Sequence, residues 1–303
     1  RAARVGSIRH RAGSGDSTPH RLDRATVPAA MTAFASRAVL DALSRAGVLL
    51  DVRGPLPDEL TGITDDSRHV TPGGLFVAVR GTARDGHDFL PSLEGRAGAA
   101  IVEDASRTTL PVYVVRDARR AAPVAAAAAY GEPGSRLQLV GVTGTNGKTT
   151  TVGMLRHLLD APGGRSASIG TLGVLVGSEG TPQPGGGGLT TPGPVELQRV
   201  LRALVDAGVT SVAMEVSSHS LDQRRVDGLA FTTAVFTNLT RDHLDYHGTM
   251  EAYVAAKARL IDYLTPTGTA VVNADDEAWQ VLGRASRQVR FSLAGNDADV
   301  RAT

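Results

Sequence analysis

The chain has 303 residues, which at roughly 100–200 residues per domain predicts two domains. Its 32 lysine and arginine residues nearly balance 31 aspartate and glutamate residues, so the charge favours neither nucleic acid nor a membrane surface as a partner. The lack of cysteine excludes disulfides and cysteine-ligated zinc and suits a cytoplasmic protein, and no apolar run reaches the roughly 18 residues of a membrane-spanning helix.

Residues 1–30 are rich in arginine, serine and threonine and contain little apolar sequence. A signal peptide needs an apolar central stretch, which this segment lacks. We expect either a disordered extension or a misplaced start, with Met31 as the true first residue, and in both cases the segment takes no part in the fold. An organelle transit peptide is the alternative interpretation.

The next part of the chain, residues 31–135, alternates helical and strand-like patterns. Apolar residues recur at helical spacing over 33–46. Short apolar runs then predict buried strands at 74–79, 99–102 and 112–115. The Gly-Glu-Pro-Gly-Ser stretch at 131–135 indicates a linker. We therefore expect a small N-terminal α/β domain that ends at this linker.

The remaining residues, 136–303, predict a second α/β domain, which we expect to be incomplete. An apolar strand at 137–142 leads into a glycine-rich loop and then a helix near 149–159. Further strands are predicted at 209–216, 230–237 and 268–273, with helices near 194–207 and 250–264. Strands that alternate with helices in this way form a doubly wound, mostly parallel sheet, which is the fold class we predict.

The glycine-rich loop is typical of a P-loop, because it lies between a strand and a helix. Its glycines let backbone N–H groups approach phosphates, the helix N-terminus adds a positive dipole end, Lys148 supplies a charge and Thr149 offers a hydroxyl to Mg²⁺. The loop departs from the commonest pattern at Val142, where glycine is usual. A glycine-rich turn with a solvated lysine is the alternative. We expect ATP to be bound by Gly144, Thr145, Asn146, Gly147, Lys148, Thr149 and Thr150.

Two polar clusters follow predicted strands, at the edge where a parallel sheet forms its ligand crevice. Glu215 lies at the end of one strand and suits Mg²⁺, which prefers one or two carboxylates together with phosphate oxygens. The alternative is a carboxylate that caps a helix. His243 lies in the polar run 237–248, within expected reach of the metal or a phosphate, although a lone histidine is usually structural. We therefore predict Mg²⁺ as the cofactor.

These motifs resemble those of a known family. The loop at 144–150 is similar to the ATP loop of the Mur ligases and the folylpolyglutamate synthetases. Met-Glu-Val-Ser-Ser-His at 214–219, the run Asn-Leu-Thr-Arg-Asp-His-Leu-Asp-Tyr-His at 238–247 and Leu-Thr-Thr-Pro-Gly-Pro at 189–194 look like the Mur ligases that add the third residue of the peptidoglycan stem peptide. Asp-Ser-Arg at 66–68 and the stretch 81–86 resemble their uridine-binding domain. The resemblance extends from about residue 63 to residue 276.

The resemblance implies a role for each matching residue. The UDP group would lie against Ser67, Thr82, Ala83 and Arg84, and the muramoyl-peptide would be held by Thr190, Thr191, Ser218, Gln223 and Arg225. The catalytic set would be Lys148, Glu215, His243 and Lys257, with Thr149, Glu215 and His243 at the magnesium sites and Asn273 facing the adenine. Lys257 matches the lysine that the family carries as a carbamate (N6-carboxylysine), an anion able to bind or orient Mg²⁺. Without the resemblance, an ordinary solvated helix lysine is favoured there.

By the same resemblance the protein would be an ATP-dependent, ADP-forming amide-bond ligase of peptidoglycan precursor synthesis, and we expect a monomer. It would join a diamino acid, meso-diaminopimelate or L-lysine, to UDP-MurNAc-L-Ala-D-Glu through an acyl phosphate. The family has a third domain with the amino-acid specificity motif, which lies outside this sequence, so we expect the chain alone to be inactive. The alternatives are a truncated remnant that binds ATP and UDP-sugars without turnover, and a ligase of the folylpolyglutamate synthetase type.

Overall fold

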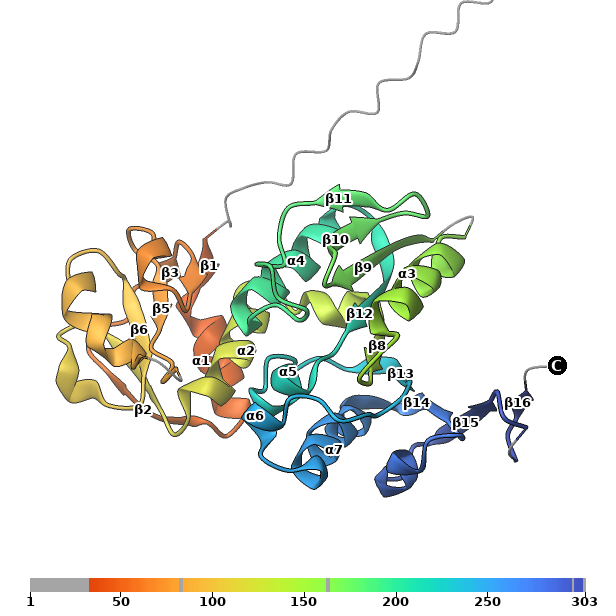
Figure 1. Ribbon diagram of the computed structural model, residues 1–303. Coiled ribbons are helices and arrows are strands. Elements are labelled where there is room, and N and C mark those ends of the chain that lie inside the picture. Colours follow the sequence, from red (N-terminus) through yellow and green to blue (C-terminus); the bar gives the residue numbers. More distant parts are fainter. Residues whose placement is uncertain (1–32, 82–83, 162–163, 296, 302–303) are drawn as a thin grey trace, which may run out of the picture.

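The computed structural model describes residues 33–81, 84–161, 164–295 and 297–301, so the extension expected at 1–30 lies outside the described residues. Two units follow one another along the chain, each built on its own sheet (Figure 1). The predicted α/β fold class is confirmed, because helices connect mostly parallel strands in both units. Within the described ranges, no helix is both long and apolar enough to cross a membrane.

The sheet of the first unit has the strand order β2-β7-β6-β5-β4. Its strands are β2 (Leu49–Arg53), β4 (Ile63–Thr64), β5 (Leu75–Val77), β6 (Ala99–Val102) and β7 (Val112–Val115). Strands β4 to β7 run parallel, and β2 pairs antiparallel with β7. A separate pair is formed by β1 (Phe34–Ala35) and β3 (Glu59–Leu60). Since parallel strands end at the same edge, the loops after β4 and β5 lie on one side of the unit.

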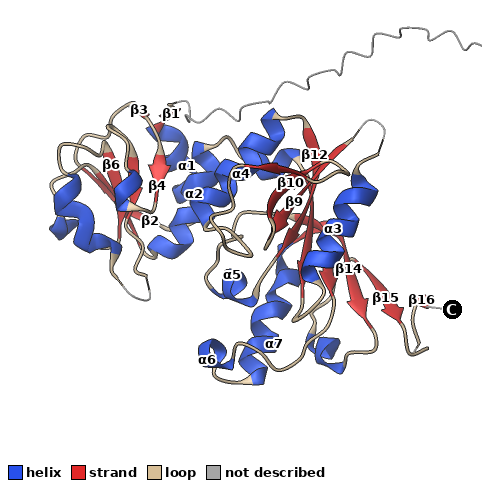
Figure 2. Ribbon diagram, turned by 45° about the horizontal axis from the view of Figure 1, so that its top comes forward, coloured by secondary structure: helices blue, strands red, loops and turns tan. Residues whose placement is uncertain are grey.

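Both faces of this first sheet are buried, as successive side chains point to opposite faces. Leu75 and Val77 pack in the core that includes α1 (Ser36–Arg45) and α2 (Ala118–Ala129). Phe76 packs on the other face, against Leu90 and Leu93 of the 3-10 helix η2 (Gly86–Leu93). Figures 1 and 2 both show α1 and α2 on the side that faces the second unit. The helix layer therefore joins the two units.

The second unit is a nine-stranded sheet with the order β11-β10-β9-β12-β8-β13-β14-β15-β16. The strands are β8 (Gln138–Thr143), β9 (Arg165–Gly170), β10 (Gly173–Val176), β11 (Thr181–Gln183), β12 (Val209–Glu215), β13 (Phe231–Phe236), β14 (Leu264–Asn273), β15 (Arg287–Ser292) and β16 (Val300–Arg301). Only β10 runs against the others, pairing antiparallel with β9 and β11, and all other neighbouring strands of this sheet pair parallel. The helices are α3 (Lys148–Leu159), α4 (Pro194–Asp206), α5 (Ser218–Asp222), α6 (Leu244–His247) and α7 (Met250–Ala258).

Helices cover both faces of the second sheet, as predicted for a doubly wound fold. On one face Val140 and Val142 of β8 pack with Val152 of α3, and on the other Leu139 shares a core with Leu201 of α4. The chain leaves β8 toward β9 and β12 on one side and later places β13 on the other side. The carboxyl end of β8 is therefore the switch point, where such sheets bind ligands.

The end of one predicted helix differs from the structure. The helix predicted at 250–264 ends at Ala258, is followed by the 3-10 helix η5 (Arg259–Tyr263), and gives way to β14 at Leu264. Pro266 disfavours helical backbone in the residue before it, which suits the extended backbone that follows η5. The domain division at 131–135 stays a prediction; the chain there enters the short 3-10 helix η4 (Pro133–Arg136) before β8.

Candidate functional site

The phosphate loop consists of the four residues 144–147 between β8 and α3. Gly144 has a φ of 146°, and a Cβ there would clash with the Thr237 hydroxyl and the Asn238 backbone. Gly147 caps α3 with a φ of 82°, a conformation that glycine adopts without strain. One glycine therefore permits a close approach of two loops, and the other permits the turn into α3.

The loop after β13 holds the phosphate loop in place. Thr145 N donates to the Asn238 carbonyl at 2.7 Å, and Asn146 N donates to the Asn238 side-chain oxygen at 3.0 Å. The N–H groups of Lys148 and Thr149 lie in the first turn of α3, where no earlier helical carbonyl accepts them. The end of α3 thus offers donors to an anion, whereas the N–H groups of Thr145 and Asn146 shape the loop.

Lys148 folds back over this loop. Its Nζ donates to the carbonyl oxygens of Gly144 at 2.9 Å and Thr145 at 2.8 Å. Burial lowers the pKa of Lys148, while the carboxylates of Glu215 and Asp242 act in the opposite direction. The solvated lysine of the alternative interpretation is therefore wrong, because the ammonium group is half-buried at the phosphate loop.

Glu215 is buried at the end of β12, directly beside the phosphate loop. Its Oε1 accepts from the Thr149 hydroxyl at 2.9 Å and from Thr171 N at 2.9 Å, and its Oε2 accepts from the Thr171 hydroxyl at 3.2 Å. Gly170 makes room for this carboxylate, since a Cβ there would overlap the Glu215 side chain. The structure therefore brings together two of the predicted magnesium ligands, Thr149 and Glu215.

The other two predicted magnesium residues lie around Tyr253. His243 is exposed, with its ring centroid 6.0 Å from that of Tyr253. Lys257 is 1% exposed, and its Nζ donates to the Gly144 carbonyl at 2.7 Å. No group of three or more histidine, aspartate and glutamate side chains within the described ranges is arranged to hold a metal. The Mg²⁺ site stays a prediction, with phosphate oxygens as the expected further ligands.

The local sequence favoured an ordinary, solvated helix lysine at Lys257, but the structure buries this side chain. Burial, helped by the charge of Lys148, lowers the pKa of Lys257 to about 7 against the opposing effect of Asp242. Its Nζ also lies 4.7 Å from the centroid of the Tyr253 ring. The low pKa leaves part of the amine neutral near neutral pH, and a neutral amine is the form that reacts with carbon dioxide.

Residues predicted to hold the muramoyl-peptide gather at the carboxyl end of β12. The Thr191 hydroxyl donates to the Glu215 carbonyl at 2.9 Å, and Arg225 Nη1 donates to the Thr191 carbonyl at 2.8 Å. The Nε and Nη2 atoms of Arg225 donate to Gln223 Oε1 at 3.1 and 2.7 Å. Thr191, Gln223 and Arg225 thus form one bonded group with the backbone of Glu215.

The two remaining members of this set border the same group. The Thr190 hydroxyl lies 3.3 Å from that of Thr171, the residue that binds the Glu215 carboxylate. The Ser218 hydroxyl at the start of α5 lies 3.0 Å from His247 Nε2. All five predicted peptide-binding residues therefore surround one strand end.

The predicted uridine residues lie apart from this group, in the first unit. Ser67 begins a 3-10 turn after β4, and Arg84 follows β5, with its carbonyl accepting from Gly81 N at 2.9 Å. Thr82 and Ala83 lie outside the described residues. A hollow of about 870 Å³ lies beside the turn that contains Ser67, between β4, the end of α2 and α4, and Asp66 and Arg199 are among the residues that line it. The UDP role of these residues stays a prediction.

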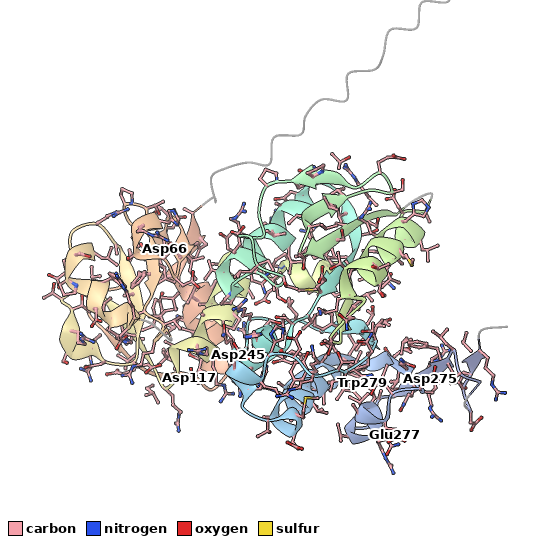
Figure 3. All side chains as sticks on the ribbon, in the orientation of Figure 1. Asp66, Asp117, Asp245, Asp275, Glu277 and Trp279 are labelled. Carbon is pink, nitrogen blue, oxygen red and sulfur yellow. The ribbon has the colours of Figure 1, made fainter. Side chains whose placement is uncertain are left out.

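Asn273 ends β14, two strands away from β8 at the same edge of the sheet. In the register, Thr143 pairs with Phe236 and Phe236 with Val272, so Asn273 lies one residue beyond the row where the phosphate loop begins. Its Oδ1 accepts from Asp275 N at 3.0 Å, at the start of the segment that Figure 3 marks with Asp275, Glu277 and Trp279. This edge position suits the adenine contact, which stays a prediction.

Comparison with known proteins decides the family. The family described as "Mur ligase middle domain" matches residues 142–303, and "Mur ligase family, catalytic domain" matches residues 59–136. The chain belongs to the Mur ligase family. The resemblance that the motifs indicated is thereby confirmed.

Two curated relatives of this Mur ligase chain share a name. It is 45% identical over 274 residues to the UDP-N-acetylmuramoyl-L-alanyl-D-glutamate–2,6-diaminopimelate ligase of Geobacter sulfurreducens, covering 87% of this chain and 53% of the relative. The ligase of the same name from Caulobacter vibrioides is 50% identical over 251 residues, covering 80% and 51%. A solved structure of a ligase with this name has a TM-score of 0.69 at 31% identity, covering 83% and 52%. The Mur ligase chain thus spans about half the length of these relatives.

The sequence alone did not single out three residues of this Mur ligase site: Thr171, Asn238 and Tyr253. Thr171 binds the Glu215 carboxylate, Asn238 holds the phosphate loop, and the Tyr253 hydroxyl lies 3.1 Å from that of Thr145. Thr171 directly follows β9, and Asn238 lies two residues after β13. Polar residues just after parallel strands were the signal for Glu215, and the same rule applied to these two strands would have found them. Tyr253 carried no such signal, because it lies within a helix.

Proposed function

We propose that the chain is the uridine- and ATP-binding part of a cytoplasmic ligase that joins 2,6-diaminopimelate to UDP-MurNAc-L-Ala-D-Glu. The observation that carries the proposal is the position of Glu215. Its carboxylate accepts from Thr149 in the first turn of α3, and its backbone carbonyl accepts from Thr191 of the predicted peptide site. Glu215 therefore contacts both the nucleotide side and the peptide side of the crevice. Transfer of a phosphoryl group from ATP to a substrate carboxylate requires that these two sides adjoin. The relatives' names support the choice of amino acid.

The residues at the phosphate loop fit ATP with Mg²⁺. The first turn of α3 and the Lys148 ammonium group present donors and positive charge to phosphates. Glu215 and the Thr149 hydroxyl would hold Mg²⁺, since a buried carboxylate that accepts only hydroxyl and backbone hydrogen bonds suits a hard cation. When bound, the ion offsets the charge on the β- and γ-phosphates.

The chemistry follows from this arrangement. A carboxylate oxygen of the precursor attacks the γ-phosphorus of ATP, ADP leaves, and an acyl phosphate forms. The amine of the diamino acid then attacks the carbonyl carbon, phosphate leaves, and the nitrogen loses a proton to give the amide. Arg225 orients the carboxylate, and Lys148 stabilises the charge that develops on the transferred phosphoryl group. We also propose that Lys257 becomes a carbamate, since its neutral amine and carbon dioxide give that anion and a proton.

Calorimetric titration tests this proposal on the chain itself. We expect the chain to bind ATP with Mg²⁺ and, independently, UDP-MurNAc-L-Ala-D-Glu. Glu215→Gln should weaken the binding of ATP with Mg²⁺ at least tenfold, whereas Glu251→Gln, which changes an exposed carboxylate on α7, should leave it unchanged. A folded chain that binds neither ligand at millimolar concentration would refute the proposal.

A further inference from the structure

The short helix α6 lies next to α5 in Figure 1, and side chains of the two helices are in contact. The Tyr246 ring is 4.2 Å from the His219 ring of α5, measured between centroids. The next residue, His247, places Nε2 3.0 Å from the Ser218 hydroxyl. Consecutive residues of α6 therefore contact the element that carries the predicted peptide-binding side chains. Tyr246 itself is not one of the residues predicted to bind ATP, Mg²⁺ or the muramoyl-peptide.

A chain of hydrogen bonds connects Tyr246 to Arg225, and its direction is determined by the chemistry of its ends. Arg225 can only donate, so the Gln223 oxygen must face the guanidinium, as it does at 3.1 and 2.7 Å. The Gln223 nitrogen then points away and donates to the Tyr246 hydroxyl at 3.2 Å. The Tyr246 hydroxyl donates in turn to Asp222 Oδ2 at 2.7 Å, a carboxylate oxygen that accepts. In this relay of hydrogen bonds from Arg225 through Gln223 and Tyr246 to Asp222, donor and acceptor cannot be exchanged at any bond.

The backbone places the partners for this relay. Arg224 has a φ of 57°, in the left-handed region, and the turn there lets the side chains of its neighbours Gln223 and Arg225 bond to each other. Among the described residues, Arg225 donates two N–H groups to Gln223 and one to the Thr191 carbonyl. Its two other N–H groups, one on each terminal nitrogen, can donate to a carboxylate of a ligand.

We propose that Tyr246 is a positioning residue for the peptide end of the precursor. It keeps the Gln223 amide in the one orientation that pins the Arg225 guanidinium. Without the phenol hydroxyl, the amide nitrogen loses its acceptor, and only the bonds from Arg225 hold the amide in this orientation. The opposite orientation would set the NH₂ group against the guanidinium, donor against donor, so the amide and the guanidinium would be held less firmly. This inference rests on the proposed function, because it assumes that Arg225 binds a carboxylate of UDP-MurNAc-L-Ala-D-Glu.

The test compares Tyr246→Phe with a matched tyrosine variant. Tyr263 also donates to an aspartate, Asp227, but lies outside the relay, so Tyr263→Phe removes the same kind of bond without touching it. By calorimetry, Tyr246→Phe should weaken the binding of UDP-MurNAc-L-Ala-D-Glu about three- to tenfold, as expected for one hydrogen bond. ATP binding should not change. Tyr263→Phe should leave the affinity for both ligands unchanged.

A double-mutant cycle separates positioning from a general structural effect. If Tyr246 acts through Gln223, then adding Tyr246→Phe to Gln223→Ala should cause no further loss of precursor binding. A second full loss, or an unchanged affinity in Tyr246→Phe alone, would overturn the inference while leaving the proposed function intact. A parent chain that binds no precursor refutes both.

A measurement on the ligand-free chain tests the relay without the proposed function. The Arg225 Nε–H signal in a nitrogen–proton spectrum should shift or broaden in Tyr246→Phe and stay in place in Tyr263→Phe. An unmoved signal in Tyr246→Phe would show that the relay does not hold the guanidinium.

Discussion

The side-chain amines of Lys148 and Lys257 meet at one acceptor, the carbonyl oxygen of Gly144, at 2.9 and 2.7 Å. They are the only two lysines in the 303-residue sequence, whose other basic side chains are arginines and histidines. Two cations that share one buried acceptor repel each other, and burial adds a larger penalty, so the pKa of Lys257 falls to about 7. The phosphate loop is thus electrostatically coupled to the residue proposed to carry a carbamate.

Removing the charge of Lys148 should therefore raise the pKa of Lys257. In Lys148→Met the pKa should rise above about 7 but stay below the ordinary value of 10.5, because burial, the larger cause, remains. Lysine-specific carbon NMR can follow this titration without overlap, since Lys257 is then the only lysine. Lys148→Arg keeps the charge and serves as the control. An identical pKa in both variants would contradict the coupling.

The low pKa of Lys257 predicts how stability depends on pH. Between about pH 7 and 10 the unfolded chain binds a proton at this lysine that the folded chain does not, so the free energy of unfolding should rise with pH across this window. The contribution is on the order of a few kcal/mol. Denaturant unfolding at pH 7, 8 and 9, in buffer free of carbon dioxide, measures it. Lys257→Met should flatten the rise, and parallel curves for the two proteins would count against the prediction.

Gly170→Ala should damage the site from within the core. The added Cβ would overlap the Glu215 carboxylate and push it away from Thr149. We expect ATP with Mg²⁺ to bind at least tenfold more weakly and stability to fall by about 1–3 kcal/mol, the usual cost of overpacking. Gly153→Ala is the matched control, because a Cβ in the middle of α3 meets open space and should stabilise the helix by roughly 0.5–1 kcal/mol. Equal ATP affinity in both variants would refute the role given to Gly170.

The chain by itself should not form the tripeptide product. Reaction requires the amine to be held roughly 3–3.5 Å from the carbonyl carbon, and such positioning contributes about 7–11 kcal/mol. Among the described residues, those at the candidate site are assigned to ATP, Mg²⁺ and the precursor, and none to the amine. Incubation with ATP, Mg²⁺, bicarbonate, UDP-MurNAc-L-Ala-D-Glu and meso-diaminopimelate or lysine, followed by mass spectrometry, provides the measurement. Product at about 10 s⁻¹, a typical enzyme rate, would disprove the prediction.

The local sequence was sufficient to locate the two halves of the crevice. A strand, a glycine-rich loop and a helix at 137–159 can be recognised from the local sequence pattern, so the positions of Lys148 and Thr149 were predictable. Glu215 was predictable for a different reason. Parallel strands end at one edge of a sheet, so a polar residue at the end of a buried strand lies in the crevice wherever it is in the chain.

Only the tertiary structure decided which groups meet at this edge. Lys257 bonds to a carbonyl 113 positions earlier, and α7 offers no sequence pattern that distinguishes a buried face, since five of its nine residues are alanine or valine. Tyr246 and Gln223 are 23 positions apart in the sequence and likewise meet only because α6 contacts α5. The local sequence indicates where helices and strands form. Distant segments supply the neighbours that bury a lysine, remove its charge and set the direction of a hydrogen-bond relay.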